Sequence, residues 1–214
     1  MSSLIERKIQ IDRHEIIVHV PAREEDYLEL AAQGESVDPY WGKIWDAALG
    51  SAECILNRQW PAGATAIELG CGIGLAGIAG LKAGLQVVFT DHEPLAVALA
   101  IENAQRNGFA DSSGHVLDWA GDGTDGTTEN KFDFCLASDV LYESDSHADL
   151  LAMAAQLLHS GGLFFIGDPG RRNARDFLTL ATKRKWKVRL FDQNQNETDV
   201  PSTNEFQWIE LKRI

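Results

Sequence analysis

The sequence feature that most constrains the fold is a glycine-rich turn that directly follows a short apolar run. In TAIELGCGIGLAG, residues 65–77, the glycines are Gly70, Gly72, Gly74 and Gly77. A glycine inside a strand or helix costs about 0.5–1 kcal/mol relative to alanine. We therefore expect the apolar run to be a buried strand and the glycines to form a sharp turn into a helix, where bare backbone N–H groups can contact a ligand.

Segments with strand character alternate with segments with helix character along the rest of the chain. Seven strands are expected, at residues 64–69, 85–91, 114–119, 132–139, 162–168, 186–192 and 205–213. Helices are expected at residues 75–84, 93–108, 146–162 and 173–184. This alternation predicts right-handed crossovers and an α/β fold with a doubly wound, Rossmann-like, mostly parallel sheet of seven strands, whose C-terminal strand is antiparallel.

The N-terminal part of the chain has a different pattern. Residues 8–22 contain two short apolar runs around a polar turn, which predicts a β-hairpin. Residues 24–32 are typical of a short helix. We therefore expect an extension at residues 1–38 and the main domain at residues 39–214, which opens with an amphipathic helix at residues 44–58.

Charge and cysteine content argue against several classes of partner. The 214-residue chain carries a formal net charge of −13. This charge repels nucleic-acid phosphates and anionic lipids, so we expect neither nucleic acid nor a membrane as a partner. Cys54, Cys71 and Cys135 are an odd number without close pairs and without the spacing of a metal site. Together with the absence of a signal-peptide pattern, they predict a reducing, cytoplasmic location.

The glycine turn fits two kinds of nucleotide-like cofactor. Gly72, Gly74 and Gly77 match the G-x-G-x-x-G pattern of dinucleotide sites, and Asp91, which ends the next expected strand, is placed to bind a ribose diol. Glu68 distinguishes the two, because a carboxylate at this strand end would repel a pyrophosphate. S-adenosylmethionine (SAM) has a cationic amine, a sulfonium and a ribose but no phosphate, so Glu68 favours SAM over NAD. The alternative is that Glu68 is only a solvated strand end.

Several polar and aromatic side chains are placed to complete a cofactor site. Asp118 and Trp119 end the third expected strand, where a carboxylate can accept from the adenine amino group and an indole can stack on the base. His92 follows Asp91 and is placed at the edge of the cofactor. Trp41 and Trp45 precede the first strand of the sheet and would form a lid. For each tryptophan, simple packing in the core is the alternative.

The combination of motifs resembles a known family. The segments IELGCGIGLAGI, VVFTD, ENAQRNG, LDWAGD and ASDVLYE are similar to those of class I, seven-strand SAM-dependent methyltransferases. The Asp-x-x-Tyr motif from Asp139 to Tyr142 resembles the motif that marks the branch of this family that methylates protein lysines. IWDAA, PYWGKIW and FFIGDPGR further resemble the electron-transfer-flavoprotein β-subunit lysine methyltransferases and their bacterial relatives. The resemblance covers roughly residues 39–170.

The residues and the resemblance together predict a SAM site, with S-adenosylhomocysteine (SAH) as the product. The predicted cofactor residues are Trp45, Glu68, Gly70, Gly72, Asp91, His92, Asp118, Trp119 and Ser138. The resemblance implies that Glu68, Gly70 and Gly72 line the methionine and ribose portion. It also implies that Ser138 lies under the transferable methyl group.

Asp139 and Tyr142 are the predicted catalytic residues. The resemblance implies that Asp139 lies under the transferable methyl, where its carboxylate would capture and orient an incoming ammonium, and it is also a candidate to receive the proton. Tyr142 would form a wall of the acceptor channel. A helix cap for Asp139 and core packing for Tyr142 are the alternatives. The Asp168 to Gly170 segment is either a plain turn or a border of the substrate cleft.

These observations lead to one main hypothesis and three alternatives. The main hypothesis is a SAM-dependent methyltransferase that acts on a protein lysine. The first alternative keeps the cofactor but has a small basic acceptor, an amine or a heteroaromatic nitrogen. The others are a nicotinamide-dependent oxidoreductase and a binding module without catalysis. The acceptor, the number of methyl groups and the oligomeric state are left open.

Overall fold

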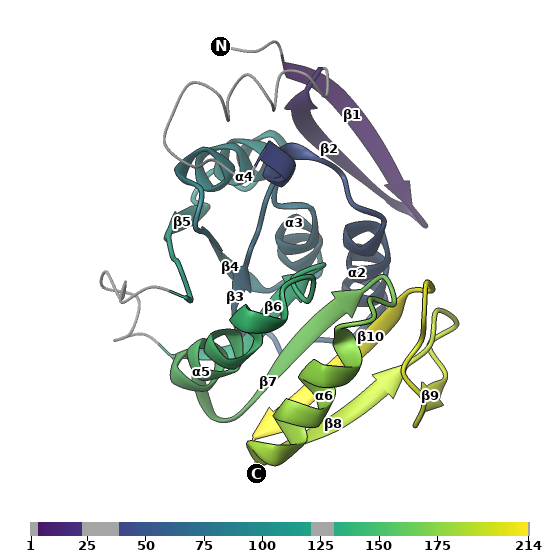
Figure 1. Cartoon of the computed structure of the whole chain (residues 1–214). Coiled ribbons are helices and arrows are strands. Elements are labelled where there is room, and N and C mark those ends of the chain that lie inside the picture. The colour runs from purple at the N-terminus through teal and green to yellow at the C-terminus, as the bar shows by residue number, and fades with distance from the viewer. Residues whose placement is uncertain (1–3, 23–38, 121–130, 214) are drawn as a thin grey trace.

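A single eight-stranded sheet forms the centre of the computed structural model, which describes residues 4–22, 39–120 and 131–213 (Figure 1). Across the sheet the strands are β5 (Ser113–Val116), β4 (Gln86–Asp91), β3 (Thr65–Leu69), β6 (Phe132–Ser138), β7 (Leu158–Asp168), β10 (Gln207–Arg213), β8 (Trp186–Phe191) and β9 (Glu197–Thr198). The first five are parallel, and β10 is antiparallel to both of its neighbours. The predicted fold class is confirmed, and the short edge strand β9 is an addition to it.

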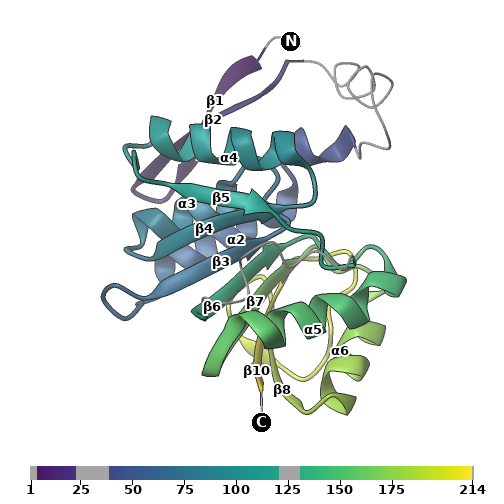
Figure 2. The same cartoon turned by 90° about the vertical axis from the view of Figure 1, so that its left-hand side faces the viewer.

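Helices cover both faces of the sheet, as Figures 1 and 2 show. The helices are α2 (Asp46–Asn57), α3 (Leu75–Lys82), α4 (Pro94–Arg106), α5 (His147–Leu157) and α6 (Ala174–Lys183), with short 3-10 helices at Pro39–Gly42 and Ser144–Ser146. The first three pack on one face and the last two on the other, and each group shares its own cluster of buried apolar side chains. This is the doubly wound arrangement.

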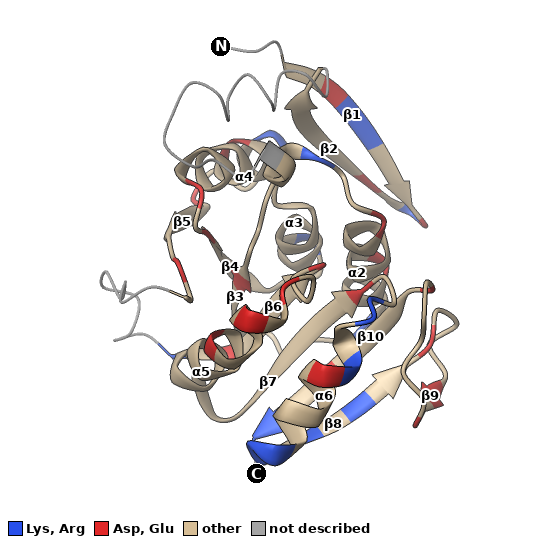
Figure 3. Ribbon diagram, in the orientation of Figure 1, with Lys and Arg blue, Asp and Glu red and all other residues tan. Residues whose placement is uncertain are grey.

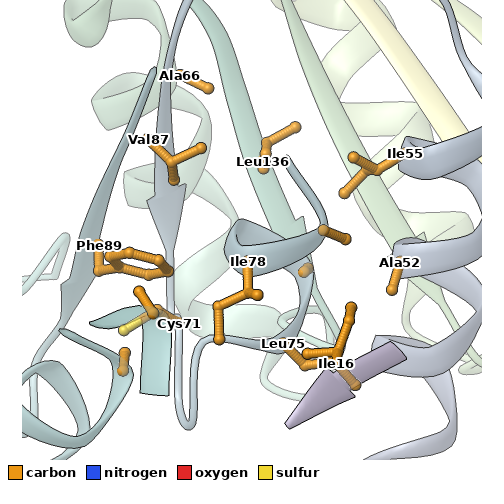
Figure 4. Packing of buried hydrophobic residues seen from close by; sticks show 14 of the residues in the cluster. Ile16, Ala52, Ile55, Ala66, Cys71, Leu75, Ile78, Val87, Phe89 and Leu136 are labelled. Atoms are coloured by element: carbon orange, nitrogen blue, oxygen red, sulfur yellow. The ribbon is translucent and has the colours of Figure 1, made fainter. Parts of the chain in front are cut away.

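The apolar cluster on the first face holds the glycine turn in place. Figure 4 shows Phe89 and Val87 of β4, Leu136 of β6 and Ile78 of α3 converging in this cluster. Burying a side chain of this size stabilises the fold by about 1.5–3 kcal/mol. The start of α3 is therefore fixed against the carboxyl ends of the strands.

The N-terminal hairpin is part of the same core. Its strands β1 (Leu4–Ile11) and β2 (His14–Pro21) form a separate two-stranded sheet. Ile16, Val18 and Val20 of β2 are buried in the cluster that also contains α3 and α4. The predicted hairpin is therefore present. The predicted helix at residues 24–32 lies outside the described residues, and the domain boundary at residue 38 stays a prediction.

Asn103 of α4 and Asn107, which directly follows this helix, bind the backbone of β2. Asn103 and Asn107 each pair their side-chain amide with both the N–H and the C=O of one residue of β2, His19 and Ile17 respectively. The Asn103 amide also donates to the Ile73 carbonyl in the glycine turn, at 3.0 Å. One buried side chain thus connects the hairpin, α4 and the turn.

The boundary between α5 and β7 differs from the prediction. The sequence pattern predicts a helix up to residue 162, but α5 ends at Leu157 and β7 begins at Leu158. Leu158 pairs with Phe132 of β6, after which the register shifts. Gly161 has φ of +86° inside this irregular stretch, a conformation that glycine adopts at little cost. From Leu158 onward the chain therefore joins the sheet as part of β7, although its sequence pattern is typical of a helix.

Charged side chains are unevenly distributed over the fold. Lys and Arg residues at the end of α6, at the start of β8 and at the end of β10 lie near the C-terminus, although the whole chain is strongly acidic (Figure 3). Across the described ranges, no helix has the length and apolar character needed to span a membrane. The same ranges hold no group of three or more His, Cys, Asp or Glu side chains suited to a metal ion.

Candidate active site

The candidate site lies at the carboxyl ends of β3, β4 and β6. Strand order reverses at β3, since the chain continues to β4 on one side and later to β6 on the other. Ligands of doubly wound sheets bind at such a switch point. A cavity of about 300 Å³ opens there. Its lining includes every predicted site residue except Asp118, namely Trp45, Glu68, Gly70, Gly72, Asp91, His92, Trp119, Ser138, Asp139 and Tyr142.

The glycines of the turn are required by its geometry. Gly72 has φ of +50°, and a Cβ at this position would lie 2.7 Å from the Trp41 carbonyl oxygen. A Cβ on Gly77 would collide with the Glu68 carboxyl and the Phe89 ring. The backbone of Gly72 therefore lies against Trp41, and the backbone of Gly77 lies against the buried carboxyl group of Glu68.

Glu68 is buried rather than a solvated strand end. Only 2% of the residue is exposed, and its Oε2 accepts the Gly77 N–H at 3.1 Å. Burial, with a smaller contribution from the charge of Asp91, raises the pKa of the Glu68 carboxyl well above its ordinary value, and the Gly77 N–H opposes this rise. The carboxyl is thus prepared to ionise when a cation lies beside it.

The backbone fixes the carboxylate of Asp91 at the end of β4. Its Oδ2 accepts the N–H of Gly72 and its Oδ1 the N–H of Glu93, at 2.9 and 3.0 Å. The Asp91 residue is 4% exposed but lines the cavity. Since carboxylate oxygens have further lone pairs, Asp91 is able to accept hydroxyl groups of a ligand. His92 lies between two carboxylates, 3.4 Å from Asp91 and 3.6 Å from Glu93.

Of the two residues predicted to contact adenine, Asp118 and Trp119, only Trp119 lines the cavity. Trp119 lines the cavity, and its ring edge lies 3.2 Å from the position of a Cβ on Gly70. Asp118 is exposed, does not line the cavity and accepts the Ala120 N–H through its own Oδ1. The roles of both residues toward adenine stay predictions.

The segment before α2 forms another side of the cavity. Tyr40, Trp41, Lys43 and Trp45 line it. The indole N–H of Trp45 donates to the Tyr40 carbonyl at 3.2 Å, and the Lys43 ammonium lies 4.5 Å from the centre of the Trp45 ring. The indole nitrogen of Trp41 is buried without an acceptor among the described residues. An acceptor on a bound ligand would satisfy this donor.

Ser138 and Asp139 lie where β6 ends. The Ser138 hydroxyl is 2.9 Å from the Ser51 hydroxyl of α2. Asp139 is 8% exposed, has φ of +58° and donates its N–H to the Gly167 carbonyl at 2.8 Å. Its carboxylate accepts from Nε of Arg171 at 2.5 Å. The buried Asp139 carboxylate is therefore paired with a cation.

A second cavity of about 480 Å³ adjoins the first. The two cavities share Trp45, Asp139, Tyr142 and Arg171 as lining residues, so these four form the wall between them. The remaining lining residues of the second cavity are Asp46, Ala47, Pro169, Gly170, Arg172, Asn173 and Asn204. The site thus has two adjoining compartments.

Asp168 fixes the turn that borders this second cavity. Its Oδ2 accepts the N–H groups of Gly170 and Arg171 and the side-chain amide of Gln207, at 2.8 to 3.0 Å. Burial raises the pKa of the Asp168 carboxyl, while these hydrogen bonds lower it. The segment after β7 is therefore a turn that borders the second cavity, and the use of this cavity by a substrate stays a prediction.

Sequence reasoning missed the cation beside Asp139. Arg171 is in the quoted segment FFIGDPGR, but it lies 32 positions from Asp139, and no local pattern reports that contact. Cys71 is also in the cavity wall, but burial raises the pKa of its thiol well above its ordinary value, which makes it a poor nucleophile. The described cysteines form no disulfide.

The sequence is similar to a family of methyltransferases. The family model described as lysine methyltransferase matches residues 24–184. The electron transfer flavoprotein beta subunit lysine methyltransferase of Danio rerio is 32% identical over 65% of this chain and 53% of its own length. Protein N-lysine methyltransferase METTL21A of Mus musculus is 29% identical over 66% of each chain. Histone-arginine methyltransferase METTL23 of Homo sapiens is 26% identical over 68% of this chain and 78% of its own.

This chain matches only part of the length of these relatives. The chain spans about half to two thirds of the length of the zebrafish and mouse relatives. Their activities and substrates therefore do not carry over by similarity alone.

Solved structures show the same fold. A ribosomal protein L11 methylase from Lactobacillus delbrueckii superposes with a TM-score of 0.66, covers 97% of this chain and 98% of its own, and is 18% identical. A TehB-like SAM-dependent methyltransferase from Corynebacterium glutamicum has a TM-score of 0.61 at 22% identity, covering 89% and 97%. The family and fold confirm the expected resemblance and its cofactor, SAM. This chain belongs to the lysine methyltransferase family.

Proposed function

We propose that the protein transfers a methyl group from SAM to the side-chain nitrogen of a lysine in a protein substrate. The observation that carries this proposal is the position of Asp139, a buried carboxylate in the wall between two adjoining cavities. One cavity contains the predicted cofactor residues, and the other gives an acceptor access to the same carboxylate.

The residues of the first cavity fit SAM. Glu68 and Asp91 supply carboxylates for an ammonium and for ribose hydroxyls, and the Trp41 indole supplies a buried donor without a partner. The Asp91 carboxylate disfavours a pyrophosphate beside the glycine turn, and the buried Glu68 carboxyl ionises only beside a cation such as the ammonium of SAM. The cavity volume of about 300 Å³ lies within the range of ligand sites, which run to roughly 1,000 Å³.

The chemistry that SAM supplies is an electrophilic methyl group: the lone pair of a neutral amine forms the new C–N bond, the C–S bond breaks with its electron pair left on sulfur, and the nitrogen then loses one proton. Because a free lysine has a pKa near 10.4, it arrives mainly as an ammonium. The Asp139 carboxylate attracts this ammonium and orients it, and one proton passes from the ammonium to Asp139 or to water before the lone pair of the neutral amine attacks the methyl group. Tyr142 lines the path of the side chain.

Two further observations support a protein as the acceptor. The second cavity is bordered by the turn after β7, by Asn173 at the start of α6 and by the exposed Asn204 before β10, so an extended side chain of a docked protein has a route to Asp139. The relatives from zebrafish and mouse are named as methyltransferases of protein lysines.

Transfer of a labelled methyl group tests the proposal. A lysate is incubated with the protein and SAM that carries a deuterated methyl group, and proteins and small molecules are then analysed separately by mass spectrometry. We expect label on lysines of one or a few proteins. Asp139→Asn should abolish this labelling, whereas Asp145→Asn, an exposed aspartate outside both cavities, should leave it unchanged.

The labelled product also separates the alternatives. Label found only in small molecules contradicts the protein acceptor and favours a small basic acceptor. Label on arginine contradicts lysine, an outcome that matters because one relative is named a histone-arginine methyltransferase. Full labelling by Asp139→Asn contradicts the role of Asp139.

A further inference from the structure

The wall between the two cavities contains one anchored carboxylate and one long cationic side chain. The backbone of Asp139 holds its position without help from Arg171, because its N–H is bound to the Gly167 carbonyl at 2.8 Å and its side chain is 6% exposed. The backbone of Arg171 is likewise fixed, by the hydrogen bond from its N–H to Asp168. Its side chain, in contrast, is 32% exposed.

The Arg171 guanidinium lies where an acceptor cation would have to bind. Its Nε donates to Oδ1 of Asp139 at 2.5 Å, and its central carbon lies 5.6 Å from the centre of the Tyr142 ring. Both partners are the predicted catalytic residues, and all three line both cavities. An ammonium that reaches the Asp139 carboxylate therefore shares its cation site with the guanidinium.

We propose that Arg171 determines acceptor specificity by occupying the cation site on Asp139, so that an acceptor binds there only by replacing the guanidinium with its own ammonium. This inference rests on the proposed function, since it assumes that Asp139 receives the acceptor.

The electrostatics of a buried carboxylate explain why such an exchange selects for cations. A buried carboxylate that loses its counter-ion bears an uncompensated desolvation cost. An alkylammonium compensates this cost when it replaces the guanidinium, and a neutral nucleophile does not. The exchange therefore favours a lysine over a hydroxyl group or an uncharged heteroaromatic nitrogen.

A positioning role for Arg171 makes the opposite prediction. If the guanidinium were needed to hold Asp139 in place, its removal would weaken the binding of an acceptor cation. If the guanidinium competes for Asp139, its removal strengthens that binding. The independent hydrogen bond of the Asp139 N–H to Gly167 favours competition.

The experiment is a titration of the complex of the protein with SAH by n-butylammonium, which has the chemistry of a lysine side chain. Binding is followed by NMR or calorimetry for the wild type, Arg171→Met and Arg171→Lys. Arg175→Met is the matched control, because it removes one exposed arginine of α6 that lines neither cavity. Asp139→Asn removes the shared partner, and n-butanol is the neutral ligand.

We expect Arg171→Met to bind n-butylammonium about three- to fivefold more tightly than the wild type, because one partly exposed competing ion pair is lost. Arg171→Lys should lie between the two, Arg175→Met should match the wild type, and Asp139→Asn should bind far more weakly. n-Butanol should not gain affinity. Equal or weaker binding of n-butylammonium by Arg171→Met overturns the inference.

The binding of SAH separates this inference from the proposed function. It is measured first for every variant and also reports that each variant is folded. If the wild type does not bind SAH, the proposed function fails. If all variants bind SAH but Arg171→Met gains no affinity for n-butylammonium, only the role of Arg171 fails.

Discussion

Glu68 and Asp91 are two buried carboxyl groups of one cavity with different electrostatic settings. Asp91 accepts two backbone N–H groups, whereas Glu68 accepts the single N–H of Gly77. Burial therefore raises the pKa of Glu68 well above its ordinary value. An ammonium placed beside this carboxyl lowers its pKa again. Binding of a ligand with a cationic amino group should thus be coupled to loss of a proton from Glu68.

This coupling predicts that SAH binding releases a proton. Affinity for SAH should rise with pH between the lower pKa of Glu68 in the complex and its higher pKa in the free protein, because the free protein binds the proton that the complex loses. Calorimetry in buffers of different ionisation enthalpy measures the release. Glu68→Gln should weaken binding and abolish the proton release, whereas the exposed Glu53→Gln should change neither. Identical proton release by Glu68→Gln would contradict this assignment.

Sequence alone could predict the residues that sit next to a motif, but not their partners. Glu68, Gly72 and Asp91 follow expected strands, and parallel strands bring such positions to one edge of the sheet. The contact of Arg171 with Asp139 depends on the turn that Asp168 fixes after β7, and the direction of a long side chain has no local sequence signal. Asp118 is exposed because β5 ends at Val116, whereas the strand pattern extends to residue 119, and its role toward adenine stays a prediction.

At the scale of elements, Asn103 joins the hairpin and α4 to the glycine turn. Its amide donates to the His19 and Ile73 carbonyls and accepts from the His19 N–H. The residue is fully buried. The apolar pattern predicts the hairpin and α4 separately, because each has its own periodicity. Nothing in that pattern reports that a polar side chain of α4 binds the edge of β2.

Asn103→Ala should therefore destabilise the protein and also weaken SAH binding. Loss of these hydrogen bonds leaves buried backbone groups without partners, which costs about 2–4 kcal/mol in the free energy of unfolding. Urea unfolding and an SAH titration measure the two effects. The control is Gln105→Ala, at an exposed position of the same helix, with a change within about 0.5 kcal/mol. A normal SAH affinity for Asn103→Ala would show that the turn does not depend on this link.

At the scale of the whole molecule, net charge is expected to govern the encounter with a substrate. The chain carries −13 overall, and Lys and Arg residues at the end of α6, the start of β8 and the end of β10 lie near the C-terminus (Figure 3). A negative molecule attracts a lysine-rich partner over several ångströms, and salt screens this attraction. Net charge predicts that nucleic acid is not a partner. The Lys and Arg residues near the C-terminus form a locally basic region on this acidic protein, so this stays a prediction.

Methylation of a basic test protein should consequently depend on salt. With poly-L-lysine as the acceptor, kcat/KM should fall about tenfold as ionic strength rises from about 0.02 to 0.3 M, because steered association loses its long-range attraction. The affinity for SAH should change little, since its contacts lie inside the cavity. A kcat/KM that is independent of salt would contradict electrostatic steering.

The central claim is that the cofactor and the acceptor use different carboxylates, Asp91 and Asp139, on the two sides of one site. Calorimetric titration of SAH into Asp91→Asn and Asp139→Asn tests this division most directly. We predict that Asp139→Asn binds SAH as the wild type does, and that Asp91→Asn binds it about 100-fold more weakly, as expected for the loss of two hydrogen bonds to a charged group. Wild-type affinity in Asp91→Asn, or loss of SAH binding in a folded Asp139→Asn, would contradict the account.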